Sequence, residues 1–273
     1  MSSHESRLTP GVSSPRRALQ MLLSFNEACP RATAAELAAR LGLPMSSVYR
    51  YVSLFRELDL LEEDEESSAL QLTPRILPVA RAALEVQDYV RVARPHLEAL
   101  SKQAGETVMM MRQSGAAAVC VSSVVSAHAL RLDFGIGHTF AFGSGATTKV
   151  MLATMGDAER SRHLDLRARD DPGFAGRRRE VEAELRETAA RGWATSEEEI
   201  EPGVWACAAA VTLDGRGPVA VTVAGPKFRI PTRQRRQIVE RTCATARAIE
   251  GIGYHNRLNE AVSPGADADP VTG

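Results

Sequence analysis

The N-terminal part of the chain has apolar residues at the spacing of amphipathic helices. Between residues 16 and 28 they recur every three or four positions, and Pro30 should end that helix. Thr33 is a suitable N-cap for a second helix over residues 34–41, because its hydroxyl can accept a backbone hydrogen bond. Glu36 stands three residues later, as a capping box requires. Two consecutive helices are therefore predicted at the start of the chain.

A third helix is predicted after Gly42, which should stop the second helix, and Pro44, which can open the next. One of its faces is apolar and the other is polar. Two short apolar stretches, 60–61 and 69–72, then flank an acidic turn, which is typical of a β-hairpin. This order of elements is that of a winged helix-turn-helix. The apolar positions of the third helix are Val48, Tyr51, Val52, Phe55 and Leu58.

The middle of the chain changes from helical to mixed periodicity. The pattern over residues 74–90 predicts a helix that joins two domains, and a further helix over 90–104 should be interrupted or restarted near Pro95. Ser114 and Gly115 form a turn between two β-like runs. The strands expected in this part cover 106–112, 116–125 and 130–134.

The C-terminal part combines helices with a second pair of strands. Two apolar runs, 204–213 and 219–224, are separated by a Gly-rich turn and predict a hairpin inside a sheet. A strongly charged helix should be closed by Gly192. The helices expected here cover 148–154, 176–190 and 231–251.

These elements predict an α+β protein with two domains joined by a helix. The second domain, of about 160–170 residues, has an ordinary size for a mixed α/β domain. Both ends of the chain are rich in Ser, Pro and Gly without apolar periodicity, so we expect them to be disordered. The predicted limits are a disordered N-terminus over 1–15, a winged helix-turn-helix over 16–73, a linker helix over 74–90, a C-terminal domain over 91–257 and a disordered tail over 258–273.

The charge balance of the whole chain hides an uneven distribution. With 33 Lys and Arg against 34 Asp and Glu the formal net charge is -1, which taken alone argues against a nucleic-acid binder. Residues 16–56 nevertheless carry six arginines and only two acidic residues, a surplus that can neutralise phosphates. Seven acidic residues follow between Glu57 and Glu66. The wing is therefore either lifted away from DNA or a solvated turn.

The polar face of the third helix fits a DNA-contacting surface. In a helix-turn-helix the second helix of the motif enters the major groove, where short polar side chains near its N-terminus meet bases and phosphates. Ser46 and Ser47 lie at this end, Arg50 follows one turn later, and the Tyr49 hydroxyl can reach a phosphate. The alternative is an ordinary three-helix bundle with a solvated polar face. The residues predicted to contact DNA are Arg16, Thr33, Ser46, Ser47, Tyr49, Arg50 and Ser53.

Four widely spaced cysteines give no indication of a metal or redox site. They are Cys29, Cys120, Cys207 and Cys243. None forms a C-x-x-C pair or has a histidine at metal-ligand spacing, so free thiols in a reducing cytoplasm are expected. The N-terminus lacks the apolar core of a signal peptide, and no run of about 18 apolar residues could span a membrane. We expect a cytoplasmic protein without membrane contact, metal or cofactor.

Five segments, in their order and spacing, make the chain resemble a known family. They are ELAARLGLPMSSVYRYV, ARPHLEALSKQAGETV, GATTKVMLA, RGWATSEEEIEPGVWACAAAV and VAVTVAGPKFRI. From about Arg16 to Ile252 the chain is similar to the IclR family of bacterial transcriptional regulators. The resemblance implies a linker helix used in dimerisation and a C-terminal GAF-like effector-binding domain, in dimers that often pair into tetramers. By position, the resemblance also implies that four residues of the recognition helix contact DNA: Ser46, Ser47, Tyr49 and Arg50.

The resemblance also implies where a small effector binds. Ser144, Gly145 and Ala146 occupy the loop that presents backbone amides to an acidic ligand in the family. Such a loop at a helix start suits an anion, because unpaired N–H groups point outward there. Thr148 replaces the glycine that usually precedes the family's lysine, whereas Lys149 is retained.

Other pocket positions implied by the resemblance are less polar here than in the family. Ser196 replaces a frequent Asp, and Ala206 replaces a frequent Cys. Cys207 follows directly and should turn to the opposite face of its strand. Two serine positions in the last strand become Thr222 and Ala224. The pocket thus keeps two hydroxyls and loses a carboxylate and a thiol.

This loss of polarity predicts an effector that is less polar than a small keto acid. Its apolar part should pack near Met109, Met111 and Leu132, since ligand pockets are mostly apolar with a few placed polar groups. Plain core packing is the alternative for the methionines, which commonly fill irregular gaps.

Together these features predict a ligand-responsive repressor of a catabolic operon rather than an enzyme. We expect it to bind a double-stranded, pseudo-palindromic operator as a homodimer or dimer of dimers, and to respond to a small organic-acid or aromatic effector. Enzymatic motifs around residues 135–150 are incomplete. The acidic run 197–199 is expected to be solvated. The alternative is a small-molecule sensor or enzyme whose N-terminal bundle only forms oligomers.

Overall fold

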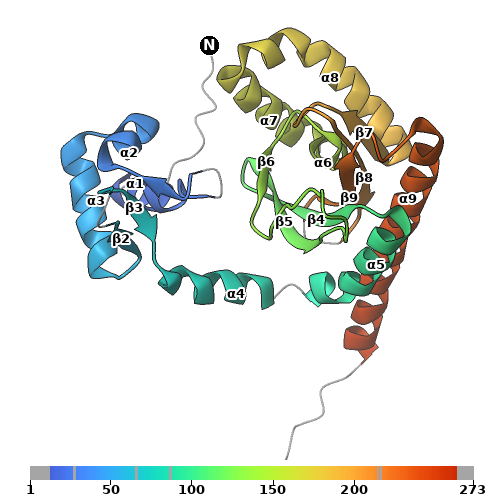
Figure 1. Ribbon diagram of the computed structural model, residues 1–273, viewed down its shortest axis with the longest axis horizontal. Coiled ribbons are helices and arrows are strands. Elements are labelled where there is room, and N and C mark those ends of the chain that lie inside the picture. Colours follow the sequence, from blue (N-terminus) through green and yellow to red (C-terminus); the bar gives the residue numbers. More distant parts are fainter. Residues whose placement is uncertain are drawn as a thin grey trace, which may run out of the picture. The chain divides into compact units, whose positions relative to one another are not determined.

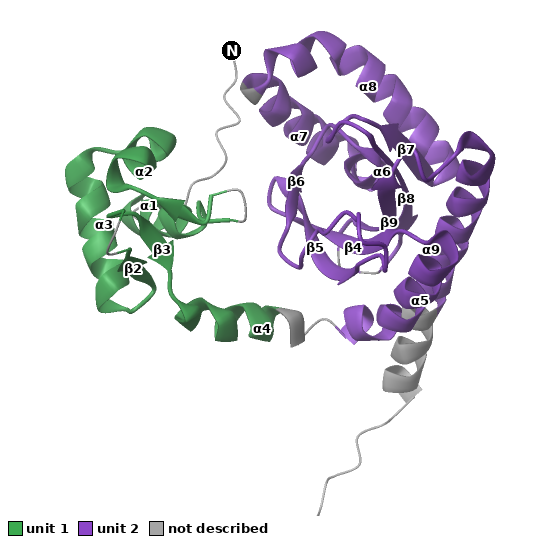
Figure 2. Ribbon diagram, in the orientation of Figure 1, with its two compact units in different colours: residues 1–86 green, residues 87–273 purple. Residues whose placement is uncertain are grey.

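A computed structural model gives the structure of the protein. Figure 2 shows its two compact units, residues 1–86 and residues 87–273. The division falls inside the stretch predicted to link the domains. The structure describes residues 13–26, 29–64, 67–85, 88–213, 215 and 217–262, without the side chains of 84–85, 170 and 252–262.

The first unit is a winged helix-turn-helix, as predicted. Its three helices are followed by a hairpin, and a short strand before the second helix adds to that hairpin (Figure 1). The small sheet is antiparallel with the strand order β1-β3-β2. Its elements are α1 (Ser13–Leu22), β1 (Arg31–Ala32), α2 (Ala34–Leu41), α3 (Met45–Glu57), β2 (Leu61–Glu63) and β3 (Leu70–Leu72).

The second helix has the limits that its sequence predicts. The backbone N–H of Glu36 donates to Thr33 Oγ1 at 3.3 Å, and the backbone N–H of Thr33 donates to Glu36 Oε2 at 2.8 Å. This reciprocal capping box satisfies two donors at the helix start. At the other end Gly42 takes the left-handed conformation, φ 61°, which costs glycine little. The capping box and this glycine fix the turn between α2 and α3.

The first helix ends earlier and begins earlier than predicted. It stops at Leu22, because the Ser24 hydroxyl donates to the Met21 carbonyl at 2.7 Å and the Asn26 side chain accepts from the N–H of Cys29 at 3.0 Å. These local bonds compete with the helix well before Pro30. The helix also includes residues 13–15, which were predicted to be disordered.

The core of the first unit follows the predicted apolar face of α3 with one exception. Val48, Tyr51, Val52 and Phe55 are all buried, whereas Leu58 is 45% exposed. Leu58 is the C-cap residue of α3. The last apolar position of the predicted pattern is therefore outside the core.

The predicted linker contains a short helical segment in the first unit. A 3-10 turn (Pro74–Ile76) leads into α4 (Leu77–Glu85). The second unit begins with α5 (Asp88–Ala104), which continues through Pro95 without the predicted interruption. Proline removes one backbone hydrogen bond from a helix, but the buried side chains of Ala93 and Leu97 hold α5 against the sheet on either side of it.

A six-stranded antiparallel sheet forms the centre of the second unit. Its strand order is β6-β5-β4-β9-β8-β7, which places the predicted hairpin of β8 and β9 in the middle. The strands are β4 (Thr107–Ser114), β5 (Ala117–Val124), β6 (Thr139–Ala141), β7 (Trp193–Glu197), β8 (Val204–Val211) and β9 (Val219–Pro226).

One predicted strand is wrong. Residues 130–134 form a loop, and the edge of the sheet beside β5 is instead occupied by β6. The carbonyl of Leu132 accepts a side-chain hydrogen bond from Thr107 at 2.6 Å, so this segment is attached to the sheet by a side chain. The N–H of Gly137 then reaches the carbonyl of Cys120 at 2.8 Å and guides the chain onto the edge.

Helices cover both faces of this sheet. In Figure 1, α5 and α9 lie on one face, and α6 lies on the other with α7 and α8 outside it. The sequence did not predict α7, whose residues are mostly charged, and α9 runs past residue 251, so residues 258–262 of the predicted tail are helical. No proline interrupts this stretch. The four helices besides α5 are α6 (Ala146–Thr154), α7 (Asp157–Asp170), α8 (Pro172–Arg191) and α9 (Thr232–Val262).

Alternation along the strands divides the second unit into two cores. On β4, Val108 and Met110 face the core made with α5 and α9, whereas Met109 and Met111 face the core made with α6. Successive side chains of a strand point to opposite faces, so this division follows from the sequence of β4 alone. The alternation decides which residues of β4, β8 and β9 can contact a ligand beside α6.

Candidate functional sites

The exposed face of α3 is the candidate nucleic-acid surface of the first unit. Ser46, Tyr49, Arg50 and Ser53 are exposed on it, with Tyr49 59% exposed, and Ser47 is half-buried. The N-cap residue is Pro44, which gives no side-chain cap. The first N–H groups of α3 therefore lack a side-chain acceptor at the N-cap, at the end where the helix dipole favours an anion.

Arg50 is held beside the core of the first unit but lacks an acidic partner among the described residues. Its guanidinium lies 5.6 Å from the centroid of the Tyr51 ring. The Tyr51 hydroxyl is 3.1 Å from the Ser14 hydroxyl and so ties α3 to α1. A guanidinium fixed on a ring and free of carboxylates can bind a phosphate or the edge of a guanine.

The acidic wing is partly neutralised by arginines of the same unit. Arg56 contacts Glu63 at 3.1 Å, and Arg31 contacts Asp64 at 3.2 Å. These side chains are mostly exposed, so the pairs stabilise the fold little. They nevertheless direct two of the six arginines toward the wing. The phosphate-binding surplus expected from the sequence is reduced accordingly, and Glu65 and Glu66 lie outside the described residues.

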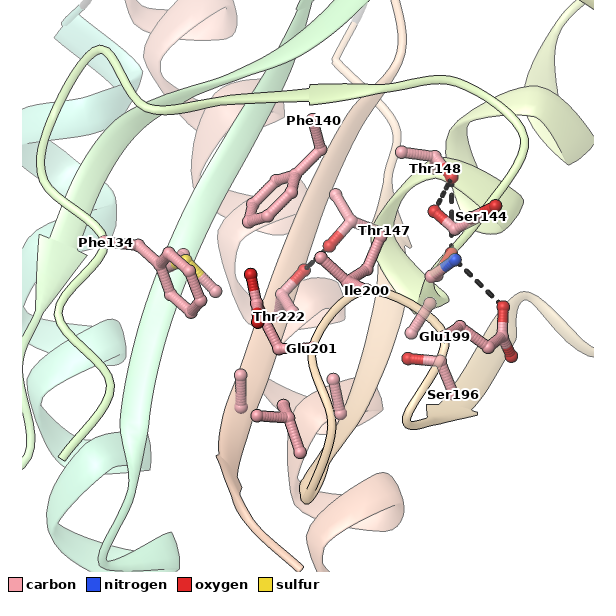
Figure 3. A pocket seen from close by; sticks show the side chains of 16 residues that line it. Phe134, Phe140, Ser144, Thr147, Thr148, Ser196, Glu199, Ile200, Glu201 and Thr222 are labelled. Atoms are coloured by element: carbon pink, nitrogen blue, oxygen red, sulfur yellow. Dashed lines mark hydrogen bonds between the residues drawn. The ribbon is translucent and has the colours of Figure 1, made fainter. Parts of the chain in front are cut away.

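The second unit has a cavity at the N-terminus of α6 (Figure 3). Its lining atoms enclose about 470 Å³ when the open mouth is included, of which about 40 Å³ admits the centre of a water molecule. This is room for a few waters, and a ring-sized ligand requires the walls to move. The lining residues are Met109, Phe134, Phe140, Ser144, Gly145, Ala146, Thr147, Thr148, Ser196, Glu199, Ile200, Glu201, Val204, Ala206, Thr222 and Ala224.

The start of α6 is bonded to a carboxylate of the chain itself. The N-cap residue Gly145 donates its backbone N–H to Glu199 Oε2 at 3.0 Å. One turn later Lys149 Nζ donates to Glu199 Oε1 and to Glu184 Oε1, both at 2.6 Å. The Lys149 side chain is 5% exposed. The anion position that a helix start offers is thus occupied by Glu199.

Most hydroxyls around the cavity are also paired. The Thr147 and Thr222 hydroxyls are 2.8 Å apart, and the Thr148 hydroxyl donates to the Ser144 carbonyl at 2.5 Å. Ser196 differs, because its residue is 8% exposed and the described residues offer its hydroxyl no hydrogen-bond partner. In Figure 3 this hydroxyl points toward the interior of the cavity. A ligand in the cavity could form a hydrogen bond with it.

Ion pairs hold the base of the loop between β7 and β8. Glu198 accepts from Lys227 Nζ at 2.5 Å and from the backbone N–H of Gly203 at 2.8 Å, and these bonds keep the pKa of its carboxyl below the ordinary value. Arg235 donates to Glu197 at 2.7 Å and likewise lowers the pKa of that carboxyl. Glu198 has a positive φ of 58°, an uncommon conformation for this residue. The loop is therefore fixed at its base, where it leads into Ile200 and Glu201.

Aromatic rings form one wall of the cavity. The Phe134 and Phe140 rings meet edge to face with centroids 5.4 Å apart, and the His138 ring lies 5.0 Å and 4.7 Å from them. Edge-to-face geometry is the favoured arrangement of such rings. Across the cavity, Ile200 lies so close to Gly145 that an added Cβ there would be 2.9 Å from it. A flat apolar group would fit between these walls once they separate.

Comparison with known families decides the identity of the fold. The model described as the IclR helix-turn-helix domain matches residues 14–65, and the model described as bacterial transcriptional regulator IclR C-terminal matches residues 81–251. The two matches cover most of the chain. The chain belongs to the IclR family. It is a DNA-binding transcriptional regulator, and repressors are among its relatives.

Individual IclR proteins agree with this assignment. The transcriptional repressor IclR of Escherichia coli (strain K12) is 25% identical over 227 residues, which cover 81% of this chain and 83% of that protein. An IclR family regulator from Brucella abortus has the same fold, with a TM-score of 0.82 and 23% identity over 92% of this chain and 96% of that chain. An IclR homologue from Microbacterium hydrocarbonoxydans, solved with 4-hydroxybenzoate, has a TM-score of 0.68 and 18% identity over 89% of this chain and 100% of that chain.

The cavity brings together most of the residues predicted to bind an effector in this IclR protein. Met111 and Leu132 pack in the same core without lining it. Cys207 is on the other side of the sheet, 3.4 Å from the Thr242 hydroxyl of α9, because strand alternation turns it away from Ala206. Burial there raises the pKa of its thiol to about 12. The predicted residues that line the cavity are Met109, Ser144, Gly145, Ala146, Ser196, Ala206, Thr222 and Ala224.

The residues predicted to contact DNA lie partly on the exposed face of α3 and partly outside α3. The residues of α3 are presented together on one exposed face, whereas the Thr33 hydroxyl is engaged in the capping box of α2. Arg16 is half-buried on α1. A contact with DNA stays a prediction for all seven residues.

The sequence interpretation missed the acidic side of the cavity. The run 197–199 is not merely solvated, because each of its carboxylates is bonded to a cation. One feature could have indicated this: Lys149 is the single charged residue of α6, and a buried lysine requires a carboxylate. Among the described residues no helix is long and apolar enough to cross a bilayer, and no group of three or more His, Cys, Asp or Glu side chains could hold a metal.

Proposed function

We propose that this IclR regulator is a repressor whose affinity for its operator changes when a small aromatic or organic-acid effector occupies the cavity at α6. The single observation that carries the proposal is this cavity, which lies in the C-terminal unit and combines an aromatic wall with a few inward-facing hydroxyls. Such a mixture is typical of small-molecule sites. The operon it controls is proposed to be catabolic, with the protein acting in the cytoplasm on DNA.

Two observations support an aromatic effector over a short keto acid. Phe134, Phe140 and Met109 give the cavity an apolar wall that a two- or three-carbon acid would not cover. The IclR homologue from Microbacterium hydrocarbonoxydans was solved with 4-hydroxybenzoate, which is a ring compound of this size. Entry of a ring requires Ile200 to move away from Gly145, and this movement couples ligand binding to the shape of the unit.

The DNA-binding half of the proposal depends on α3. Its exposed N-terminus carries Arg50 and Tyr49 without acidic partners among the described residues, as contact with a phosphate backbone requires. A homodimer would present two such helices to the two halves of a pseudo-palindromic operator, and a dimer of dimers would present four. Effector and DNA binding would then be coupled reciprocally.

Arg50→Ala tests this half directly. We expect the variant to lose about 1–3 kcal/mol of affinity for the operator, because a bidentate contact of arginine with a base has this value. Fluorescence anisotropy with DNA from the region upstream of the gene measures the affinity. Arg236→Ala is the matched control, because it removes the same charge from the second unit. The Arg236 side chain on α9 is 90% exposed. Equal affinities of the two variants would exclude Arg50 from the interface.

A salt series separates this function from the alternative of a sensor or enzyme that only oligomerises through its N-terminal unit. Phosphate contacts make the logarithm of the DNA affinity fall steeply with the logarithm of the salt concentration. We expect a steep slope for the native protein and a smaller slope for Arg50→Ala. Absence of DNA retention at low salt would favour the alternative.

A further inference from the structure

The charges around the cavity restrict the kind of ligand that it can accept. We propose that the cavity selects an aromatic compound that carries hydrogen-bond donors and no negative charge, and that Glu199 and Glu201 exclude the corresponding carboxylate. This inference rests on the proposed function, because it assigns a ligand class to the same cavity. The proposed function leaves open whether the effector is an organic acid or an aromatic compound, and this inference selects the aromatic compound.

The place for a ligand carboxylate is already taken by the chain. Glu199 accepts the N–H of Gly145 at 3.0 Å and the ammonium of Lys149 at 2.6 Å, which are the two donors that an acidic ligand would otherwise use at the start of α6. Lys149 is shared with Glu184 at 2.6 Å, so one positive charge already faces two carboxylates. A third carboxylate would bring negative charge without a new cation to neutralise it.

The lining of the cavity carries a further negative charge, on the solvent-exposed residue Glu201. Figure 3 shows the Glu201 carboxylate projecting between Phe134 and Thr222. No Lys, Arg or His is present among the described residues that line the cavity. A ligand carboxylate would therefore lie near two like charges with an apolar wall behind it, and such an environment favours uncharged or cationic groups.

The unpaired groups of the cavity lining can accept a hydrogen bond from a donor on the ligand. Ser196, an 8% exposed residue, has a hydroxyl that can accept or donate and lacks a partner among the described residues, whereas the Glu201 carboxylate accepts hydrogen bonds only. A phenolic hydroxyl or an amide N–H can donate to either. The ring that carries it would lie against Phe134 and Phe140, whose edges and faces suit an aromatic neighbour.

A matched pair of ligands tests the inference on the full-length protein. 4-Hydroxybenzamide and 4-hydroxybenzoate have nearly the same shape, and at pH 7.5 the amide is neutral whereas the acid is an anion. We expect isothermal titration calorimetry to give a Kd for the amide that is at least about tenfold lower, because like charges in a partly desolvated site repel strongly. The native protein and two single variants are titrated with both compounds.

The variants show whether the cavity charge causes the preference. Glu201→Gln keeps the shape of the side chain and removes its charge, so the preference for the amide should shrink by about tenfold. Glu197→Gln is the matched control, because this neighbour in the same loop faces Arg235 and does not line the cavity. It should retain the preference of the native protein.

Three results would overturn the inference. The acid could bind the native protein as tightly as the amide, Glu201→Gln could behave like Glu197→Gln, or neither compound could bind. A parallel anisotropy titration of operator DNA keeps this test separate from the proposed function. If the amide binds tightly and the operator affinity does not change, the proposed function fails while the ligand class stands. If the acid binds more tightly and releases DNA, the inference fails while the proposed function stands.

Discussion

The N-termini of α3 and α6 are built alike and used differently. Each helix begins at a residue that gives no side-chain cap, Pro44 or Gly145, and each has a cation within two turns, Arg50 or Lys149. At α3 the cation contacts a tyrosine ring and is exposed. At α6 the N–H and the cation are both bonded to Glu199. The first terminus is free to meet an external anion, whereas the second already holds an internal one.

This difference shows that a helix start is an anion site only while its donors are free. The dipole and the unpaired N–H groups favour negative charge in both places. In α6 the chain supplies that charge itself, through a carboxylate 54 positions away in the sequence. In α3, which belongs to the IclR helix-turn-helix domain, the N-cap residue leaves the first N–H groups without a side-chain acceptor, as contact with the phosphates of DNA requires.

The largest expected effect concerns Lys149, which is paired with two carboxylates at the start of α6. Lys149→Met should lower the free energy of unfolding of the second unit by about 3 kcal/mol, because removing one partner of a buried ion pair leaves uncompensated carboxylates. The value lies at the lower end of the range for such pairs, since Glu199 and Glu184 are 31% and 37% exposed. Urea unfolding followed by tryptophan fluorescence measures it, because both tryptophans, Trp193 and Trp205, lie in the second unit.

Lys227→Met provides the control for this prediction. Lys227 is paired with Glu198 of the same loop, but its side chain is 40% exposed, so the loss should be about 0–1 kcal/mol. Equal losses for the two variants would contradict the view that the α6 terminus is neutralised from within, and would place Lys149 with ordinary surface lysines.

A smaller effect on stability is expected at the N-terminus of α2, whose donors are neither free, as in α3, nor bonded to a distant residue, as in α6. There a local side chain satisfies the donors, because Thr33 and Glu36 form the capping box. Thr33→Ala should destabilise the first unit by about 1 kcal/mol. Far-UV circular dichroism during urea unfolding and hydrogen exchange of the Leu37 amide both report this change.

Thr33→Ser separates the cap from the predicted DNA contact. Serine caps as well as threonine, so the stability of the first unit should be unchanged. If Thr33 acts only through the cap, operator affinity measured below the unfolding transition should be equal in the native protein, Thr33→Ser and Thr33→Ala. An affinity loss in Thr33→Ala alone, under conditions where all three proteins are folded, would instead make the Thr33 hydroxyl a direct contact.

The three termini also explain what the sequence predicts well. The limits of α2 follow from Thr33, Glu36 and Gly42, which act within one or two turns of the chain. The buried face of α3 follows from helical periodicity, and the alternation on β4 assigns its methionines to two cores. Such features are local, so a pattern of neighbouring residues is sufficient to find them. The exposed face of α3 lies opposite this buried face, so the same periodicity predicts it.

The cavity depends on contacts that no local pattern contains. Glu199 meets Gly145 and Lys149 across 54 and 50 positions, and the aromatic wall arises because residues 130–134 form a loop in place of a strand. The sequence around residues 197–199 therefore indicates a solvated run, although the cations that pair with its carboxylates lie elsewhere in the fold. The family resemblance implies an effector loop at Ser144, which lines the cavity in the structure, but it gives no information on which carboxylate meets that loop.

The smallest effect is a difference in pH dependence between the two units. Burial lowers the pKa of His163 on α7 from the usual 6.5, with Glu159 opposing and Arg162 adding to the shift. Hydrogen bonds from Thr33 lower the pKa of Glu36 from the usual 4.5. In both cases the unfolded chain binds the proton more readily, so stability is present above the usual pKa and is lost as the pH falls through the lowered value.

The second unit should therefore begin to lose stability below pH 6.5, and the first unit only below pH 4.5, in addition to any general acid destabilisation. Urea unfolding at a series of pH values, with tryptophan fluorescence for the second unit and exchange of the Leu37 amide for the first, measures the two profiles. His163→Gln should reduce the pH dependence of the second unit's stability near pH 6.5. Thr33→Ala should reduce the pH dependence of the first unit's stability. If both units lose stability together from pH 6.5, the titrating groups are not His163 and Glu36. The contrast between the second unit, where the chain neutralises the start of α6, and the first unit, where a capping box closes α2, would then not extend to their pH dependence.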